Sequence, residues 1–152
     1  MKRVKVRSLS DAFDYVTDGF EKDTLAIISI QKSADGGYGF RFIENSRCKG
    51  VLTLLFDDIE KPVNGLALFS EQQAQQIIDF VLAHRHDADT LLVHCYAGQS
   101  RSRAVGAFAL RMLGGDNSEY LRSGLHNRHV YDTLMRVWEQ RRLAEVAEND
   151  SM

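Results

Sequence analysis

Apolar residues gather in three short runs that are typical of buried β-strands. The runs are Leu25–Ile30, Val51–Leu55 and Leu91–His94, and each has the length of a strand rather than of a helix. A fourth segment, Val4–Leu9, alternates between apolar and polar positions, which is typical of a strand at the edge of a sheet. Residues 32–42 are rich in glycine and predict a mobile surface loop.

Between these runs, apolar positions repeat with helical spacing. Ser70–His84 is the clearest case, because Ser70 and Gln73 can form a capping box ahead of an apolar stripe. Arg103–Leu113 is apolar on nearly all sides, which predicts a buried helix ended by the glycines at 114 and 115. Weaker helical patterns cover residues 10–16, 117–122 and 129–146. Strands that alternate with helices predict an α/β fold, with a central, mostly parallel sheet of four to five strands flanked by helices.

The composition is that of an ordinary globular protein, and we expect one domain over residues 1–152, with a tail that frays from about residue 146. The net charge of −2 gives no global positive field for nucleic acid or an anionic membrane. No apolar run approaches the ~20 residues that cross a bilayer, and the basic N-terminus lacks the apolar segment of a secretory signal. Two cysteines, Cys48 and Cys95, fit a reducing cytoplasm better than a disulfide framework.

The sequence Val-His-Cys-Tyr-Ala-Gly-Gln-Ser-Arg-Ser, residues 93–102, sets a cysteine between a predicted strand and the predicted buried helix. This is the carboxyl end of a strand, where open α/β sheets bind ligands. Backbone N–H groups of such a loop, with the N-terminus of the following helix, form a cradle for anions. Gly98 allows the turn, and the planar guanidinium of Arg101 can grip two oxygens of a phosphate. These surroundings favour the thiolate of Cys95 and place it for in-line attack on phosphorus.

A cysteine at the end of a buried strand is more often a small core residue than a nucleophile. Here, however, five positions agree with an anion-binding loop, namely His94, Cys95, Gly98, Arg101 and Ser102. From typical residue frequencies, we estimate that a chance match in a chain of this length is rarer than about one in ten thousand. The match also falls at a predicted strand–loop–helix junction, so a functional cysteine is favoured.

This run resembles the signature H-C-x-x-G-x-x-R-[ST] of the cysteine-dependent protein tyrosine phosphatases, and its ending is similar to that of the dual-specificity branch. The resemblance implies hydrolysis of phosphomonoesters, in a phosphorylated protein or a small molecule, through a phosphocysteine on Cys95 and without a cofactor. It implies that Arg101 binds phosphate and stabilises the transition state, and that Ser102 donates a hydrogen bond to the sulfur. His94 would orient the loop and help to keep Cys95 ionised. Phosphate oxygens would be held by backbone N–H groups of Tyr96, Ala97, Gly98, Gln99, Ser100 and Arg101.

The chemistry also needs a proton donor for the leaving group and a base for the hydrolytic water. In the family, one aspartate on a loop before the cysteine does both. Asp57 and Asp58 follow the predicted strand Val51–Leu55, whose end should lie on the same edge of the sheet as Cys95. Alignment of Leu-Thr-Leu-Leu-Phe-Asp-Asp with the dual-specificity phosphatases places Asp58 on the acid, and Asp57 stays the alternative.

Other candidate residues have weaker patterns. Asn127 resembles a position in the family's final loop, and it can cap the last helix or support the phosphate loop. Cys48 is either a buried bystander or, on oxidation, a partner of Cys95. Arg103 adds one cation beside the loop, either solvated or in contact with substrate. No metal is expected, because four histidines lack a consistent ligand spacing with carboxylates or thiols. They are His84, His86, His126 and His129.

Two other functions stay open at this point. One is a non-catalytic phosphate-binding module, or pseudophosphatase, which would keep the cradle and lose the acid. The other is a sulfur- or arsenate-handling enzyme that uses the same thiolate. Loop residues 96–100 carry no charge, which disfavours phosphoinositides and RNA triphosphates as substrates. No feature of the sequence indicates an oligomeric state.

Overall fold

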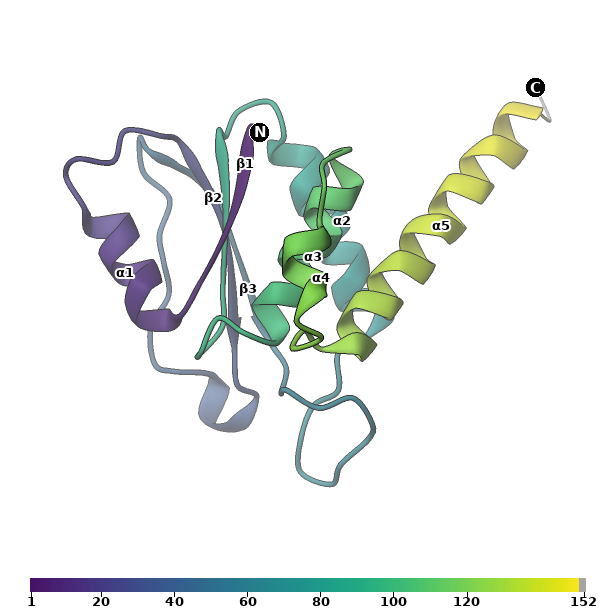
Figure 1. The fold of residues 1–152 in the computed structure, drawn as a ribbon, viewed down its shortest axis with the longest axis horizontal. Coiled ribbons are helices and arrows are strands. Elements are labelled where there is room, and N and C mark those ends of the chain that lie inside the picture. Colours follow the sequence, from purple (N-terminus) through teal and green to yellow (C-terminus); the bar gives the residue numbers. More distant parts are fainter. Residues whose placement is uncertain (151–152) are drawn as a thin grey trace.

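Four parallel strands form a single sheet at the centre of the computed structural model, which describes residues 1–150 (Figure 1). Their spatial order is β1 (Arg3–Arg7), β4 (Thr90–His94), β2 (Leu25–Gln31) and β3 (Cys48–Leu55). The two central strands are buried along their whole length, and this is why their sequences are continuously apolar rather than alternating. The predicted α/β fold with a parallel sheet is confirmed, and β1 is an edge strand as expected. It ends at Arg7, however, because Ser8 caps the helix that begins at Leu9.

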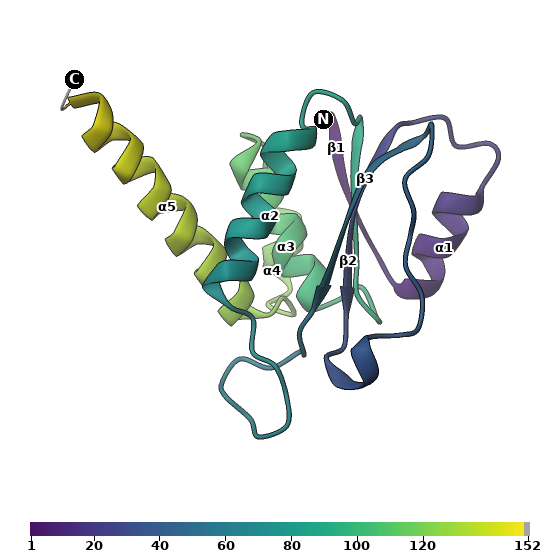
Figure 2. The same ribbon diagram turned by 180° about the vertical axis from the view of Figure 1, so that it is seen from behind.

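Helices cover both faces of the sheet. One face of the sheet carries α1 (Leu9–Thr17) (Figures 1 and 2). Buried residues of α1 form a small apolar core there with residues of β2 and β4. The opposite face carries the larger core and the remaining helices (Figure 2). These are α2 (Glu71–His84), α3 (Arg101–Met112), α4 (Ser118–Arg122) and α5 (Arg128–Asp150). No helix within residues 1–150 is long and apolar enough to cross a membrane.

The boundaries of three segments differ from or refine the predictions. β3 begins already at Cys48, because its first residues pair with β2 in spite of their weak strand propensity. α5 continues through Asp150, since no glycine or proline interrupts it, and fraying of the tail from about residue 146 stays a prediction. The glycine-rich loop contains one short 3₁₀ turn, Ala34–Gly36. The predicted capping box of α2 is present, with Ser70 and Gln73 each bonded to the other's backbone N–H.

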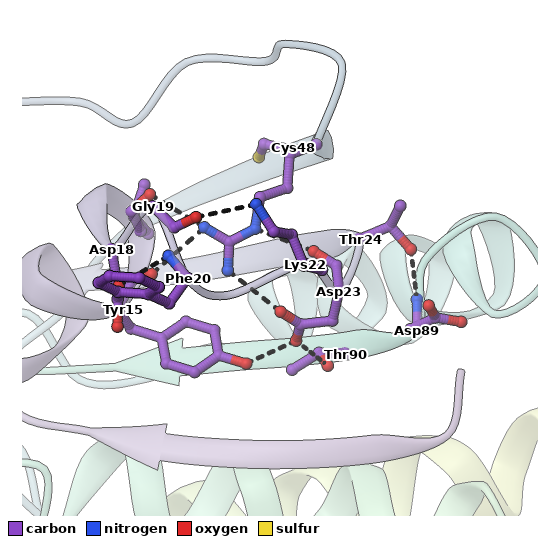
Figure 3. A network of polar contacts seen from close by, with 12 residues as sticks. Tyr15, Asp18, Gly19, Phe20, Lys22, Asp23, Thr24, Cys48, Asp89 and Thr90 are labelled. Atoms are coloured by element: carbon purple, nitrogen blue, oxygen red, sulfur yellow. Dashed lines mark hydrogen bonds and ion pairs between the residues drawn. The ribbon is translucent and has the colours of Figure 1, made fainter.

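At the amino ends of the strands, a polar network surrounds Asp23 (Figure 3). Its carboxylate, only 9% exposed, accepts hydrogen bonds from the hydroxyls of Tyr15 and Thr90. The guanidinium of Arg47 lies 3.1 Å from the same carboxylate and also donates to the backbone oxygen of Asp23. Burial and the bond to Asp23 raise the pKa of Tyr15 to about 12. The network therefore ties α1, β3 and β4 together at the edge opposite the cysteine loop.

Asp23→Asn is expected to lower the free energy of unfolding by roughly 2–4 kcal/mol at pH 7, because Arg47 would lose its carboxylate partner while staying mostly buried. Burial alone would raise the pKa of Asp23, but hydrogen bonds from Thr90, Tyr15 and Arg47 outweigh it and lower the pKa. The stabilisation is therefore fully present above about pH 4 and is lost as the pH falls through the lowered pKa. Urea unfolding at pH 7 and pH 3 measures this effect. The difference between Asp23→Asn and wild type should shrink at pH 3, whereas the exposed control Asp14→Asn should show little effect at either pH.

Candidate active site

The cysteine loop lies at the carboxyl edge of the sheet, between the end of β4 and the start of α3. A cavity of about 470 Å³ opens there. It brings together most of the loop and the preferred acid, and adds one residue that the sequence did not suggest, Leu125. The lining residues are Asp58, Cys95, Tyr96, Ala97, Gln99, Ser100, Arg101 and Leu125.

Cys95 lies at the floor of this cavity, and its side chain is almost fully buried, at 3% exposure. Its sulfur lies 3.1 Å from the hydroxyl oxygen of Ser102 and 3.3 Å from the backbone nitrogen of Gly98, which donates a hydrogen bond to it. Both contacts come from the loop and the first turn of α3. A thiolate at this position can accept hydrogen bonds from both the Ser102 hydroxyl and the Gly98 N–H, as a nucleophilic cysteine would require.

The N-terminus of α3 is left open for an anion. Ser100 occupies the N-cap position but makes no capping bond, because its hydroxyl donates instead to Asp58 at 2.7 Å. The first N–H groups of α3 therefore have no side-chain cap, and a bound phosphate oxygen can satisfy them. Arg101 follows directly, buried, with Nη1 donating to the backbone oxygen of Phe56 at 2.8 Å. This bond fixes the guanidinium from outside the cavity.

Gly98 is required by the packing of the loop as well as by its backbone angle. Its φ is +73°, and a Cβ there would lie 2.6 Å from the carbonyl carbon of Arg7 and the nitrogen of Ser8. The loop thus closes against the end of β1. The backbone N–H of Leu9 also donates to the carbonyl oxygen of Tyr96 at 3.0 Å, so the start of α1 supports the loop from the same side.

Given the phosphatase activity that the sequence resemblance implies, Gly98→Ala is expected to lower kcat/KM for an aryl phosphate by at least about 100-fold, because the loop must shift to relieve the clash. Gly124→Ala is the matched control, since its φ of +70° is nearly the same but nothing lies within 4 Å of the added Cβ. Both alanines are strained by about 1–2 kcal/mol in the left-handed region. Steady-state kinetics with melting temperatures separates the two effects. Equal losses of activity in both variants would contradict a role for the close packing of Gly98.

His94 is the end of a chain of buried hydrogen bonds. Its Nδ1 lies 3.1 Å from the carbonyl oxygen of Cys95, which can only accept, so Nδ1 carries the proton. Its Nε2 therefore accepts from the hydroxyl of Ser29 at 2.6 Å, and Ser29 in turn accepts from Gln31 at 3.1 Å. Burial lowers the pKa of His94, as does the charge of Arg101, and this outweighs the opposing bond to Cys95. The imidazole of His94 therefore orients the backbone of Cys95 through its Nδ1–H.

The two neighbouring aspartates have different surroundings. Asp57 accepts from the hydroxyl and the backbone N–H of Ser33 and, at 2.7 Å, from the backbone N–H of Ala67. Partial burial would raise the pKa of Asp57, but these bonds and the charge of Arg101 lower it. Asp57 therefore accepts hydrogen bonds that join the loop at Ser33 to the loop at Ala67. Asp58 is exposed and lines the cavity, which suits the proton donor.

Asn127 positions Asp58 from the start of α5. Its amide Nδ2 donates to Oδ1 of Asp58 at 2.9 Å and to the backbone oxygen of Ile59 at 3.0 Å. Its Oδ1 accepts from the backbone N–H of Val130, so the same side chain also caps α5. The capping role is present. The phosphate loop is supported by the backbone N–H of Asn127, which donates to the carbonyl oxygen of Ser100 at 3.1 Å, whereas the side chain holds the loop after β3. Ser100 and Asn127 both bond to Oδ1 of Asp58. Its other oxygen, Oδ2, accepts no hydrogen bond from the described part of the chain.

Cys48 is remote from this site. β3 pairs Cys48 with Leu25, which is aligned with Thr90, at the opposite end of β4 from Cys95. At about 3.3 Å per residue, the two cysteines are some 16 Å apart along the strand direction, far beyond the ~7 Å limit for a disulfide. Burial raises the pKa of Cys48, so it is the buried bystander and not an oxidation partner.

The histidines do not form a metal centre within residues 1–150. No group of three or more His, Cys, Asp or Glu side chains in this range could hold a metal ion. His84 bonds to Asp87, and Nε2 of His129 to the backbone oxygen of Phe69. Arg103 lies beside Tyr120, with its guanidinium 5.9 Å from the ring, and does not line the cavity.

Several residues of the site were missed from the sequence. Tyr38, from the glycine-rich loop, accepts a bond from Nη2 of Arg101 at 3.3 Å, and its ring lies 5.9 Å from that of Tyr96. Ser29 and Gln31 hold His94 and the glycine-rich loop. A signal existed for these two, because they are polar residues in an otherwise apolar buried strand. No local signal pointed to Tyr38 or Leu125.

A parallel sheet of this order, with a cysteine loop between β4 and α3, is the fold of the cysteine-dependent protein tyrosine phosphatases, and the predicted resemblance is confirmed at the level of the fold. The structure is similar to that of DUSP15, at 18% identity, over 93% of this chain and 90% of DUSP15, with a TM-score of 0.58. It is similar to Tk-PTP in the active form, at 16% identity over 91% and 92% of the two chains, with a TM-score of 0.56. PTPMT1 matches at 16% identity over 96% and 95%, with a TM-score of 0.55. No protein-family profile matches the chain, and no curated protein matches its sequence.

Proposed function

We propose that this protein is a cysteine-dependent phosphatase of the dual-specificity type, formed by a single domain over residues 1–152. One observation carries the proposal. The buried sulfur of Cys95, the uncapped N-terminus of α3, the guanidinium of Arg101 and the carboxyl group of Asp58 meet in one cavity. An anion-binding cradle with a thiolate at its base and a proton donor at its rim has the parts for phosphoryl transfer.

In the first step, the thiolate of Cys95 attacks phosphorus, an S–P bond forms and the P–O bond to the leaving group breaks. Asp58 gives its proton to the departing oxygen. Arg101 and the N–H groups of the loop bind the three equatorial oxygens, where charge is spread in the transition state. Nη1 of Arg101 donates one bond to Phe56 and Nη2 one to Tyr38, so three of the five guanidinium N–H groups remain for the phosphate.

In the second step, water attacks the phosphocysteine and the S–P bond breaks. Asp58, now ionised, takes a proton from the water, and the hydroxyl of Ser102 donates to the leaving thiolate at the 3.1 Å separation seen here. Inorganic phosphate leaves and the enzyme returns to its starting state. Each proton and bond is accounted for by these residues and water, so the mechanism requires no cofactor.

The proposed substrates are phosphorylated proteins or small phosphomonoesters. PTPMT1 has been solved in complex with PI(5)P, so a phosphoinositide is the alternative that a structural neighbour suggests. Arg101 is the one cation that lines the cavity within residues 1–150. It can pair with a single phosphate and leaves further phosphates without a cationic partner, which favours a monophosphate. The proposed place of action is the cytoplasm, because Cys95 must stay reduced.

Hydrolysis of an aryl phosphate between pH 5 and 8, with and without vanadate and a metal chelator, tests the proposal. We expect turnover that vanadate blocks and the chelator does not affect. No turnover, with inorganic phosphate still bound by the loop, would instead identify a non-catalytic phosphate-binding module. Rapid transfer of sulfur from thiosulfate to cyanide would identify a sulfurtransferase.

A further inference from the structure

A second cavity of about 450 Å³ lies next to the phosphate cavity, and Tyr96 lines both. Leu9, Ser10 and Phe13 from the first turns of α1 form the rest of its lining, and we name it the α1 groove. Phe13 and Tyr96 are unusually exposed for large aromatic residues, at 39% and 64%. An open apolar surface that continues a substrate cavity is a candidate for binding a further part of the substrate.

The α1 groove is held in shape before anything binds. The ring of Phe13 lies 4.7 Å from Phe40 and 5.3 Å from Phe42, and both of these rings lie against His94. The backbone bond from Leu9 to Tyr96 fixes the opposite wall to the cysteine loop. A preformed groove loses little conformational entropy when a ligand binds, so apolar contacts there contribute directly to affinity.

The charges on α1 beside the groove disfavour anionic occupants. Its four lining residues are uncharged, and α1 contains no basic residue. Asp11 and Asp14, both exposed on α1, place negative charge beside the groove. A second phosphate would be repelled here, and an anionic membrane surface would lack the lysines and arginines that normally attract it. The groove therefore suits an uncharged, apolar group.

We infer that the α1 groove binds an apolar side chain of a phosphoprotein substrate, close in sequence to the phosphorylated residue. The inference rests on the proposed function. Tyr96 lines both cavities, and successive residues of an extended peptide advance by about 3.3 Å. A phosphorylated side chain in one cavity thus places the side chain of a near neighbour at the other. The protein recognises its substrate through this neighbour as well as through phosphate.

A series of synthetic phosphopeptides tests the inference. Each peptide has a phosphotyrosine in an alanine background, with a single leucine or aspartate at one position within two residues of it, and a second set carries phosphothreonine. At one position, we expect leucine to raise kcat/KM about tenfold over alanine, and aspartate to lower it. Ser10→Trp, which fills the groove from an exposed position, should abolish the gain from leucine and leave turnover of para-nitrophenyl phosphate unchanged.

Thr17→Trp is the matched control, because it adds the same side chain to α1 at a residue that does not line the groove, about two turns from Ser10 and one turn from Phe13. It should keep the preference for leucine. The inference would be overturned, while the phosphatase proposal stands, if kcat/KM were the same for all peptides or if the preference for leucine survived in Ser10→Trp. Faster hydrolysis of a phosphoinositide in vesicles, lost in Ser10→Trp, would show that the groove serves a lipid instead.

The binding of the same peptides to Cys95→Ser, measured by calorimetry, separates the two proposals. If wild type is inactive on every substrate but the leucine peptide binds more tightly through the groove, the phosphatase proposal fails and the groove assignment holds. If binding does not depend on leucine, the groove assignment fails whether or not the protein is an enzyme.

Discussion

Cys95→Ser is expected to lower kcat for an aryl phosphate by at least about 10⁴-fold, because a serine hydroxyl at neutral pH supplies almost none of the anionic nucleophile that the reaction needs. The replacement keeps the size and the position of the side chain. The two contacts of the sulfur, to Ser102 at 3.1 Å and to the N–H of Gly98 at 3.3 Å, remain possible for an oxygen. We therefore expect the fold and the binding of inorganic phosphate to survive.

The chain supplies its own control for this substitution. Cys48 is the other cysteine, equally buried, and lies at the opposite edge of the sheet. Cys48→Ser should keep kcat within about twofold, since a substitution this far from the cysteine loop can change the free energy of unfolding but not the reacting groups. Rapid quenching during turnover of a ³²P-labelled substrate should trap a phosphoprotein in wild type and in Cys48→Ser, and none in Cys95→Ser. A phosphoprotein in Cys95→Ser would mean that another residue is the nucleophile.

The features that were predictable from the sequence are local ones. A strand, a loop and a helix that follow one another within some twenty residues fix the positions of Cys95, Gly98 and Arg101 relative to one another. The parallel strand runs place their carboxyl ends on one edge, so the proximity of Asp58 to Cys95 followed from the fold class. The sequence alone offered both Asp57 and Asp58 as acids, because neighbouring residues differ only in where their side chains point.

The missed features depend on segments that meet only in three dimensions. Tyr38 reaches Arg101 from a glycine-rich loop whose path no periodic pattern describes. Leu125 lines the cavity from the turn before α5, and the α1 groove forms because the first turn of α1 lies against the loop at Tyr96. These residues surround the candidate active site. The proposed catalytic centre was thus more predictable than the surface that would select a substrate.

Asp58→Asn and Asp57→Asn are expected to affect different properties, although the residues are adjacent. In Asp58→Asn, the leaving oxygen loses its proton donor, so kcat for phenyl phosphate should fall roughly 10²–10³-fold. The loss should be much smaller for para-nitrophenyl phosphate, whose leaving group departs without protonation. The limb of the pH profile that requires a protonated acid should disappear. Asn127 and Ser100 can still hold the side chain in place, because both bond to a single oxygen of Asp58.

Asp57→Asn should leave kcat within about threefold for both substrates, because the carboxyl group of Asp57 faces Ser33 and Ala67 rather than the cavity. The substitution should instead lower the free energy of unfolding, by roughly 1–3 kcal/mol, because an amide replaces a carboxylate that accepts three hydrogen bonds. Kinetics with both leaving groups, together with urea unfolding of both variants, measures the contrast. If Asp57→Asn shows the dependence on the leaving group and Asp58→Asn does not, the proton donor is Asp57. The loop after β3 would then have to turn by one residue to bring it over Cys95.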